Sequence, residues 1–208
     1  MDTGTRKIIV ATGNEGKMKE IRQILGHGNI VFSSLKDEDL QHVEIIEDGS
    51  TFEENAVIKA RKISDITGQM VLADDSGLEV DYLDKAPGIY SARYMGEDTP
   101  YSVKNQHIID LLEGVEDDRR TARFVCVIAC AFPDGHTITT RGTIEGRIGY
   151  EEKGTNGFGY DPIFYVPEFG CTTSELTPEE KNTVSHRGKA LREFREKLEL
   201  YLKERGMG

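Results

Sequence analysis

The chain has 208 residues, of which 37% are hydrophobic, 30% charged and 8% aromatic. This length and composition suit one globular domain that buries its own core, and they exclude disordered, collagenous and membrane-spanning classes. A formal net charge of −11 repels nucleic acid and anionic membranes, so we expect neither as a partner.

The start of the chain and its cysteines indicate where the protein works. No apolar run approaches the roughly 20 residues that a membrane-spanning helix needs, and residues 1–6 contain no apolar signal stretch. We therefore expect a cytoplasmic protein with a flexible N-terminus over residues 1–6. Cys126, Cys130 and Cys171 lack CxxC or metal-finger spacing and are odd in number, which predicts reduced core residues rather than disulfides.

The first predicted unit is a strand, a loop and a helix. A short buried strand is expected over residues 7–11, and apolar residues then recur at helical spacing over residues 18–25, up to a C-cap at Gly26. A second helix begins with Ser50 or Thr51 as its N-cap, followed three residues later by Glu53 or Glu54. It is expected to end near residue 68, directly before a second strand.

The second strand is expected over residues 70–73. Thr99 is the expected N-cap of a third helix, with Pro100 at the first helical position. Residues 121–132 and 136–143 read as the two strands of a hairpin around Pro-Asp-Gly, and residues 191–202 as a closing helix. This order predicts an α/β protein with a mixed sheet, whose ligand loops lie at strand ends.

A glycine-containing turn lies between the first strand and its helix. Backbone N–H groups and the helix dipole favour a phosphate there, and a lysine adds positive charge. The turn is not a Walker A loop, because Ala11 and Met18 stand where that motif needs Gly and Ser or Thr. An ordinary turn is the alternative. The candidate phosphate-binding residues are Thr12, Gly13, Asn14, Glu15, Gly16 and Lys17.

The second helix carries Asn55 and Lys59 four residues apart on its apolar stripe. Lys59 either extends to water from the edge of the helix or lines the same pocket as Lys17. The chain places Asp74 and Asp75 directly after the second strand. Carboxylates are hard ligands that suit Mg²⁺, and one of them could also orient or deprotonate an attacking water.

The two acids precede Ser76-Gly77, so a simple turn is the competing interpretation. Glu47, in the loop before the second helix, is a further candidate metal ligand.

An aromatic residue between glycines follows later in the chain. A flat ligand could reach the face of Phe158, and Asp161 could accept a hydrogen bond from a nucleobase. A glycine-rich hairpin with a packed aromatic is the alternative. At the start of the last helix, His186 and Arg187 oppose the helix dipole, which predicts an anionic ligand or a solvated basic turn.

Six strings in order resemble the Ham1/RdgB/inosine triphosphatase family of non-canonical purine nucleotide pyrophosphatases over residues 7–202. They are ATGNEGK, FEENAVIKAR, LADDSGLEVD, APGIYSARY, GFGYDPIF and SHRGKAL. The resemblance implies a single domain over residues 1–208, with an elongated, two-lobed α/β fold around a long central mixed sheet. It also implies an active-site cleft between the lobes, and a homodimer.

The resemblance also implies residue roles. Residues 12–17, Asn55 and Lys59 would hold the triphosphate. Asp75 would be the general base and a Mg²⁺ ligand, with Asp74 and Glu47 near the metal. The residues that would contact the rest of the substrate are Ser76, Phe158, Gly159, Tyr160, Asp161, Lys181, His186 and Arg187.

The implied reaction is hydrolysis of ITP, dITP, XTP or dXTP to the monophosphate and pyrophosphate. Hydrogen-bond donors facing the 6-keto oxygen would accept these bases and reject adenine, because unpaired buried donors are costly. Two alternatives remain open: a Maf-like nucleotide pyrophosphatase of other base specificity, and a nucleotide-binding module without catalysis.

Overall fold

The computed structural model describes residues 6–26 and 28–206. The strands are β1 (Arg6–Val10), β2 (Ile30–Ser34), β3 (Val71–Val80), β4 (Thr121–Ala131), β5 (Thr137–Ile148), β6 (Phe164–Val166) and β7 (Cys171–Thr172). The helices are α1 (Glu15–Leu25), α2 (Phe52–Thr67), α3 (Tyr101–Leu111), α4 (Pro178–Val184) and α5 (His186–Glu204). Short 3-10 helices form at Asp81–Leu83, Gly88–Tyr90, Asp117–Arg119 and Asp161–Ile163.

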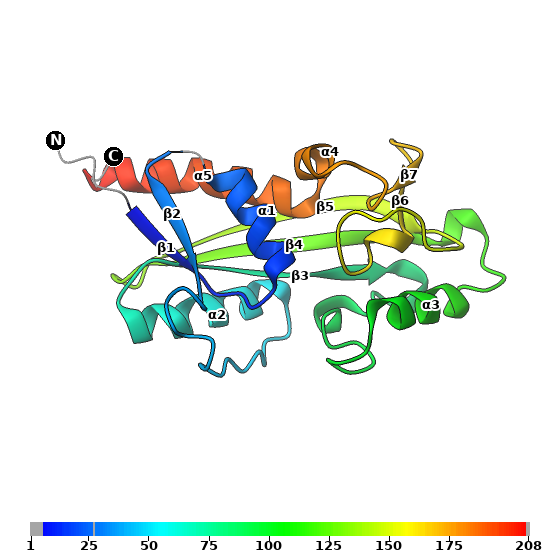
Figure 1. Ribbon diagram of the computed structural model, residues 1–208, viewed down its shortest axis with the longest axis horizontal. Helices are drawn as coiled ribbons and strands as arrows, with labels where there is room; N and C mark the ends of the chain where they lie inside the picture. Colours follow the sequence, from blue (N-terminus) through cyan, green and yellow to red (C-terminus); the bar gives the residue numbers. More distant parts are fainter. Residues whose placement is uncertain (1–5, 27, 207–208) are drawn as a thin grey trace. The chain divides into compact units, whose positions relative to one another are not determined.

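The expected α/β class with a mixed sheet is confirmed. The strand order is β2-β1-β3-β4-β5-β6-β7 (Figure 1). β1 runs parallel to β2 and β3, whereas β6 is antiparallel to β5 and β7. Within the described part of the chain, no helix is long and apolar enough to cross a membrane.

The expected flexible segment, residues 1–6, lies outside the described residues except for Arg6, which is the first residue of β1. The chain divides into two compact units. Unit 1 consists of Met1–Asp75, Cys126–Gly142 and Arg187–Gly208, and unit 2 consists of Ser76–Val125 and Thr143–His186. Residues of β3, β4 and β5 belong to both units.

In unit 1, helices cover both faces of the strands. α1 and α5 lie on one side of β1 and β3, and α2 lies on the other (Figure 1). Ile8 of β1, Ile21 of α1 and Phe194 of α5 belong to one buried cluster and are fully inaccessible to solvent. The α2 face carries small and aliphatic residues, including the fully buried Ala60 and Ile63, so this helix sits close to the strands.

Unit 2 has its own apolar core. Its members come from the ends of β3 and β4, from α3, and from β6, and they include Leu78, Ile108, Phe124 and Phe164. The Phe124 and Phe164 rings lie 4.3 Å apart between centroids, within the range of favourable aromatic pairs. This core is the support for the glycine-rich segment at residues 154–161.

The second strand is longer than predicted. We expected it over residues 70–73, with Asp74 and Asp75 directly at its end, but β3 continues through both acids to Val80. The turn interpretation of Asp-Asp-Ser-Gly is therefore wrong. Cationic side chains of distant segments contact both carboxylates, which offsets the cost of burying them in a strand. Gly77 has no positive φ that would interrupt the strand.

The third helix begins one residue later than predicted. Pro100 is its N-cap, and the hydroxyl of Thr99 donates to the carbonyl of Met95 instead of capping the helix. The side chains that α3 buries are not the apolar ones alone. Val103 is 47% exposed, whereas Lys104 and Asn105 are each only 1% exposed.

Three strands and one helix have no counterpart in the sequence prediction. β6 and β7 have 3 and 2 residues, too few to show the alternation of a strand. β2 has only 5 residues and ends in two serines. α4 did carry a signal, since Thr177 and Glu180 form a capping box with Pro178 at the first helical position.

The start of α2 provides a test of local helix chemistry. Thr51 is the N-cap, and its hydroxyl accepts from the Glu54 N–H at 3.1 Å, which selects Thr51 over Ser50. We expect Thr51→Ala to lower the free energy of unfolding by about 1 kcal/mol and Thr51→Ser to lower it far less, because serine retains the acceptor. Urea unfolding of both variants checks this; equal losses would mean that the methyl group, not the cap, is important.

Candidate active site

The turn between β1 and α1 is held by its own side chains. The Asn14 side chain is the N-cap of α1 and accepts from the Lys17 N–H at 3.0 Å, while the Thr12 hydroxyl accepts from the Asn14 N–H at 3.2 Å. The structure thus brings the predicted residues 12–17 together at a helix N-terminus, where Glu15 and Gly16 form the first turn. Such a turn can stand without a ligand.

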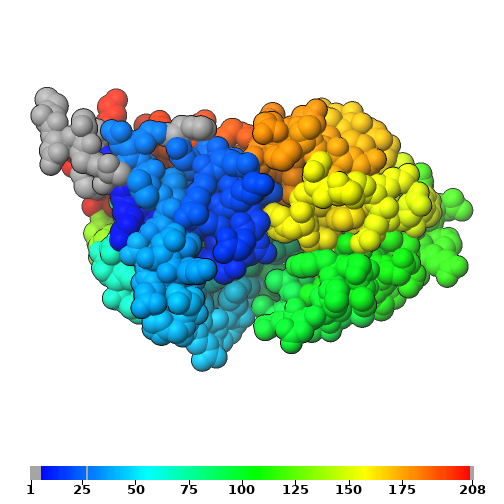
Figure 2. All heavy atoms as spheres, in the orientation of Figure 1, coloured from blue at the N-terminus to red at the C-terminus, as the bar shows by residue number. Residues whose placement is uncertain are grey.

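Gly13 is not required by the backbone of this turn. Its φ is not positive, and a Cβ built on it would meet nothing within 4 Å. The open space belongs to an accessible surface, since residues 13–15 are exposed and α1 lies on the visible face in Figure 2. A pocket of ≈260 Å³ lies beside the turn, bounded also by residues 34–36 and Gln41. Neither backbone strain nor a steric clash within the protein therefore explains the glycine, and a phosphate contact at Gly13 stays a prediction.

Two cationic side chains contact the Asp74 carboxylate. Its Oδ2 is 3.1 Å from Lys17 Nζ and 3.1 Å from Arg187 Nη2, and Arg187 also pairs with Glu20 of α1. The Asp74 side chain is wholly buried, and Arg187 is only 2% exposed. Arg187 therefore does not depend on an external anion: the protein's own carboxylates compensate its charge, contrary to the expectation from the helix start.

The pKa values follow from these pairs. Burial raises the pKa of Asp74, but Lys17 and Arg187 outweigh it and hold that pKa well below its usual range. Burial opposes the charged form of Arg187, but Glu20 and Asp74 raise its pKa above the usual value. Asp74 and Arg187 are therefore both charged at neutral pH.

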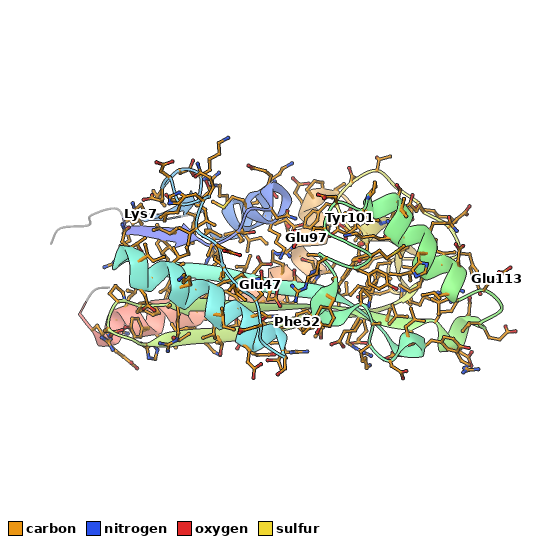
Figure 3. All side chains as sticks on the ribbon, turned by 90° about the horizontal axis from the view of Figure 1, so that it is seen from below. Lys7, Glu47, Phe52, Glu97, Tyr101 and Glu113 are labelled. Atoms are coloured by element: carbon orange, nitrogen blue, oxygen red, sulfur yellow. The ribbon has the colours of Figure 1, made fainter. Side chains whose placement is uncertain are left out.

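Asp75 has a different environment. Its Oδ1 is 2.9 Å from Lys59 Nζ, and the same ammonium group is 2.9 Å from Oε2 of Glu47, which Figure 3 labels beside α2. Burial raises the pKa of Asp75 although Lys59 opposes the shift. The pKa of Lys59 is lowered by burial but raised, on balance, by Asp75 and Glu47. Lys59 therefore lies inside the site, and does not extend to water.

Asn55 is fully buried and serves the loop that carries Glu47. Its Oδ1 accepts from the Gly49 N–H at 2.9 Å, two residues after Glu47, while its Nδ2 has no hydrogen-bond partner. A direct contact between Asn55 and a triphosphate stays a prediction.

The carboxylates allow a test of whether a divalent cation fits. Oδ2 of Asp75 is buried and has no hydrogen-bond partner, and Glu47 faces the same lysine. Two carboxylates suit Mg²⁺, which keeps several waters and takes further oxygens from phosphates. Among the described residues, no three acidic, histidine or cysteine side chains are gathered as a ready ligand set. Asp75 and Glu47 fit the group, and a metal contact of Asp74, whose Oδ2 contacts Lys17 and Arg187, stays a prediction.

The glycine-rich segment of unit 2 is organised around Asp161. Its Oδ2 accepts from the Phe158 N–H at 2.8 Å and from Lys181 Nζ at 2.6 Å, and its Oδ1 accepts from the Thr173 hydroxyl at 2.9 Å. Gly157 has a φ of +77°, and any Cβ there would collide with the Asp161 carboxylate. Asp161 thus folds the loop, and a bond from Asp161 to a base stays a prediction.

Phe158 and Lys181 lie together in this loop. Lys181 Nζ is 4.8 Å from the Phe158 ring centroid, and Phe158 is half-buried rather than packed into the core. The loop is not the hairpin that we considered as an alternative, because residues 155–157 form bends and residues 159–160 form a turn that leads into the 3-10 helix at Asp161–Ile163. A partly exposed ring with a cation beside it is suited to stack on a flat ligand.

The other predicted residues of unit 2 occupy separate positions. The His186 ring stacks on Phe124 at 4.9 Å between centroids, and the Tyr160 hydroxyl donates to the Ser91 carbonyl at 2.8 Å. Tyr160 is buried, and a contact between Tyr160 and substrate stays a prediction. Ser76 lies within β3 and is partly exposed.

Sequence reasoning missed two residues that organise the site. Glu20 contacts Arg187, and Thr173 contacts Asp161. Glu20 left a signal, because it is an acid three residues after Lys17 on the buried side of α1. Thr173 left none, since it follows a two-residue strand.

Comparison with known proteins identifies the family. A model of the Ham1 family matches residues 8–197. A dITP/XTP pyrophosphatase of Exiguobacterium sibiricum is 51% identical over 198 residues, which are 95% of this chain and 100% of the relative. A dITP/XTP pyrophosphatase of Listeria monocytogenes is 48% identical over 192 residues, covering 92% of this chain and 94% of its own.

Solved structures agree. The Ham1 protein of Staphylococcus aureus matches with a TM-score of 0.84 at 39% identity, covering 93% of this chain and 98% of its own. A HAM1 protein from Coxiella burnetii matches with a TM-score of 0.82 at 42% identity, covering 96% and 99%. This chain belongs to the Ham1 family.

The environment of Asp74 predicts a defined dependence of stability on pH. Asp74→Asn leaves Lys17 and Arg187 short of a buried partner, so we expect the free energy of unfolding at neutral pH to fall by roughly 3–5 kcal/mol. Because the folded-state pKa of Asp74 is lowered, the wild-type advantage should stay constant down to about pH 3.9, the unfolded-state pKa.

Below that pH the advantage should shrink, because the unfolded state binds a proton that the folded state refuses. Denaturant unfolding of both proteins at several pH values measures it. An advantage that has already vanished in mildly acidic buffer, well above the unfolded-state pKa, would contradict the assignment.

Proposed function

We propose that this chain hydrolyses the non-canonical purine nucleotides dITP, ITP, XTP and dXTP to the monophosphate and pyrophosphate, and so removes them from the nucleotide pool. It is a hydrolase of nucleoside triphosphates, like its relatives of about half-identical sequence. The observation that carries the proposal is the cluster of Lys59, Asp75 and Glu47, in which a buried carboxylate oxygen has no partner.

The division of labour in unit 1 follows from its charges. Lys17 and Lys59 provide ammonium groups that offset triphosphate charge, and the N–H groups at the start of α1 favour phosphate oxygens. Asp75 would orient an attacking water toward the α-phosphorus and take up its proton. Positioning and electrostatic stabilisation carry this kind of phosphoryl chemistry, so no covalent intermediate with the protein is needed.

Asp75 and Glu47 would hold a divalent cation, which we propose is Mg²⁺. When bound, such an ion supplies Lewis-acid charge for the phosphate oxygens and makes a bound water more acidic. Asp74 is left with a different task, which is to keep Lys17 and Arg187 in place.

In unit 2, we propose that Phe158 stacks on the base while Lys181 and neighbouring donors face its polar edge. The 6-keto oxygen of hypoxanthine and xanthine accepts hydrogen bonds, whereas the 6-amino group of adenine in ATP does not. We further propose that His186 takes part in this recognition, that the protein acts as a homodimer, and that it works in the cytoplasm, whereas Arg187 stays with its buried carboxylate partners.

The products identify the reaction. With ITP and Mg²⁺, we expect inosine monophosphate and pyrophosphate as first products, and far slower turnover of ATP and GTP. Chromatography of the nucleotide products with a coupled pyrophosphate assay measures both. Orthophosphate with a nucleoside diphosphate as first products would sink the α-phosphorus mechanism, and a preference for pyrimidine or methylated nucleotides would favour a Maf-like specificity.

Metal removal is part of the same experiment. We expect exhaustive chelation to abolish turnover and added Mg²⁺ to restore it, because Asp75 and Glu47 are anionic and repel a triphosphate unless a cation lies between them. Undiminished turnover after chelation would contradict the assignment of Asp75 and Glu47.

Substitution separates the roles of Asp75 and Phe158. Asp75→Asn should lower kcat on every nucleotide by on the order of 10²-fold or more, because it removes the group that positions water. Phe158→Ala should weaken binding by roughly 1–3 kcal/mol, as expected for loss of a base–aromatic stack, and raise KM more than it lowers kcat.

Steady-state kinetics on ITP and melting temperatures with and without nucleotide check both variants. A near-normal kcat for Asp75→Asn, or an unchanged KM with a collapsed kcat for Phe158→Ala, would show that the two roles are assigned wrongly.

A further inference from the structure

Helix α3 turns polar side chains toward the inside of unit 2. Lys104 and Asn105 are each 1% exposed, while Val103 and Leu111 on the same helix are 47% and 43% exposed. Burying polar groups instead of apolar ones costs stability unless each group gains a specific partner. The partners therefore show what this face of α3 is for.

Asn105 reaches the glycine-rich loop directly. Its Nδ2 donates to the Gly159 carbonyl at 3.2 Å and to Oε1 of Glu152 at 2.6 Å. Both partners are acceptors, so the orientation of the amide is unambiguous. One side chain of α3 thus fixes the backbone one residue after Phe158 and also ties down the segment that precedes the loop.

Tyr101 lies four residues before Asn105, on the same face of α3, and Figure 3 labels it there. Its ring meets Tyr160 edge-on, with centroids 5.2 Å apart. A Cβ added to Gly159 would sit 3.6 Å from the same ring. The buried Lys104 amine is 4.9 Å from the Tyr101 ring centroid and donates to the Ala92 carbonyl at 2.7 Å. The Tyr101 ring and the Asn105 amide of α3 therefore support residues 159–160.

We propose that Asn105 is a specificity-determining positioning residue. By fixing the Gly159 carbonyl, it sets where the neighbouring Phe158 ring lies against the base. This proposal rests on the proposed function of the Phe158 segment. It concerns discrimination between bases and not the phosphoryl chemistry, because every contact of Asn105 is made within unit 2, whereas the lysine–carboxylate cluster belongs to unit 1.

The test compares N105D, N105D/E152Q and the control Q106A. N105D puts a carboxylate where the amide donated, so both contacts become repulsive. E152Q restores a donor opposite the new carboxylate but gives nothing to the Gly159 carbonyl. Gln106 is exposed, and its amide contacts only Asp110 among the hydrogen bonds of the described side chains.

For N105D, we expect the preference for ITP over GTP in kcat/KM to fall by roughly tenfold, mainly through KM. The reason is that a displaced Phe158 ring fits the base less well. Inhibition by inorganic tripolyphosphate, which has no base, should stay within about twofold of wild type, since the phosphate-binding groups are untouched. N105D/E152Q should recover melting temperature but not the preference, and Q106A should match wild type throughout.

A purely structural role would lower melting temperature without changing the preference, and that result would overturn the proposal. Recovery of the preference in N105D/E152Q would overturn it too, because the effect would then act through Glu152. If N105D weakened inhibition by tripolyphosphate as much as it raised KM for ITP, that would show that Asn105 does not act on the base.

A measurement without nucleotide keeps the two proposals distinct. Hydrogen–deuterium exchange of residues 154–161 should rise in N105D and stay at the wild-type level in Q106A. If wild type fails to hydrolyse ITP while exchange behaves as expected, the proposed function has failed and the positioning contact stands. If exchange in N105D equals that of wild type, the inference fails whatever the kinetics show.

Discussion

The interior of β3 contains two consecutive carboxylates, and unit 1 is arranged to neutralise them. A charge taken out of water is costly unless it meets an opposite charge and hydrogen bonds. The pleat of a strand sends neighbouring side chains to opposite faces, so the two carboxylates form ion pairs with different cations. Lys17 and Arg187 accordingly reach Asp74 from the side of α1 and α5, and Lys59 reaches Asp75 from α2.

This arrangement gives two identical side chains different chemistry. Asp74 touches two cations, which hold its pKa low. Asp75 touches one ammonium group, which it shares with Glu47, and burial prevails and raises its pKa. One oxygen of Asp75 stays without a hydrogen bond, while Asp74 acts as the counterion that fixes Lys17 beside the β1–α1 turn. The two acids therefore differ in their partners and in the direction of their pKa shifts.

Features with a local cause could be predicted from the sequence. Thr51 and Gly68 delimit α2 through their own backbone geometry, and the Pro-Asp-Gly turn closes the β4–β5 hairpin. The extent of β3 could not be predicted, because the partner that makes Asp74 tolerable in a strand is 113 residues away. The polar buried face of α3 was missed likewise, since helical periodicity expects apolar residues inside.

The candidate site shows the same limit. The six sequence motifs identified the segments that carry the site. They did not show whether Arg187 would face a ligand or the protein's own acids. The bridge from Arg187 to Glu20 joins residues 167 positions apart, so it forms only when the C-terminal helix has reached α1. During synthesis, Asp74 and Glu20 emerge long before their guanidinium partner does. Asp74 and Glu20 therefore gain this buried counterion only after α5 has been synthesised and has packed against α1.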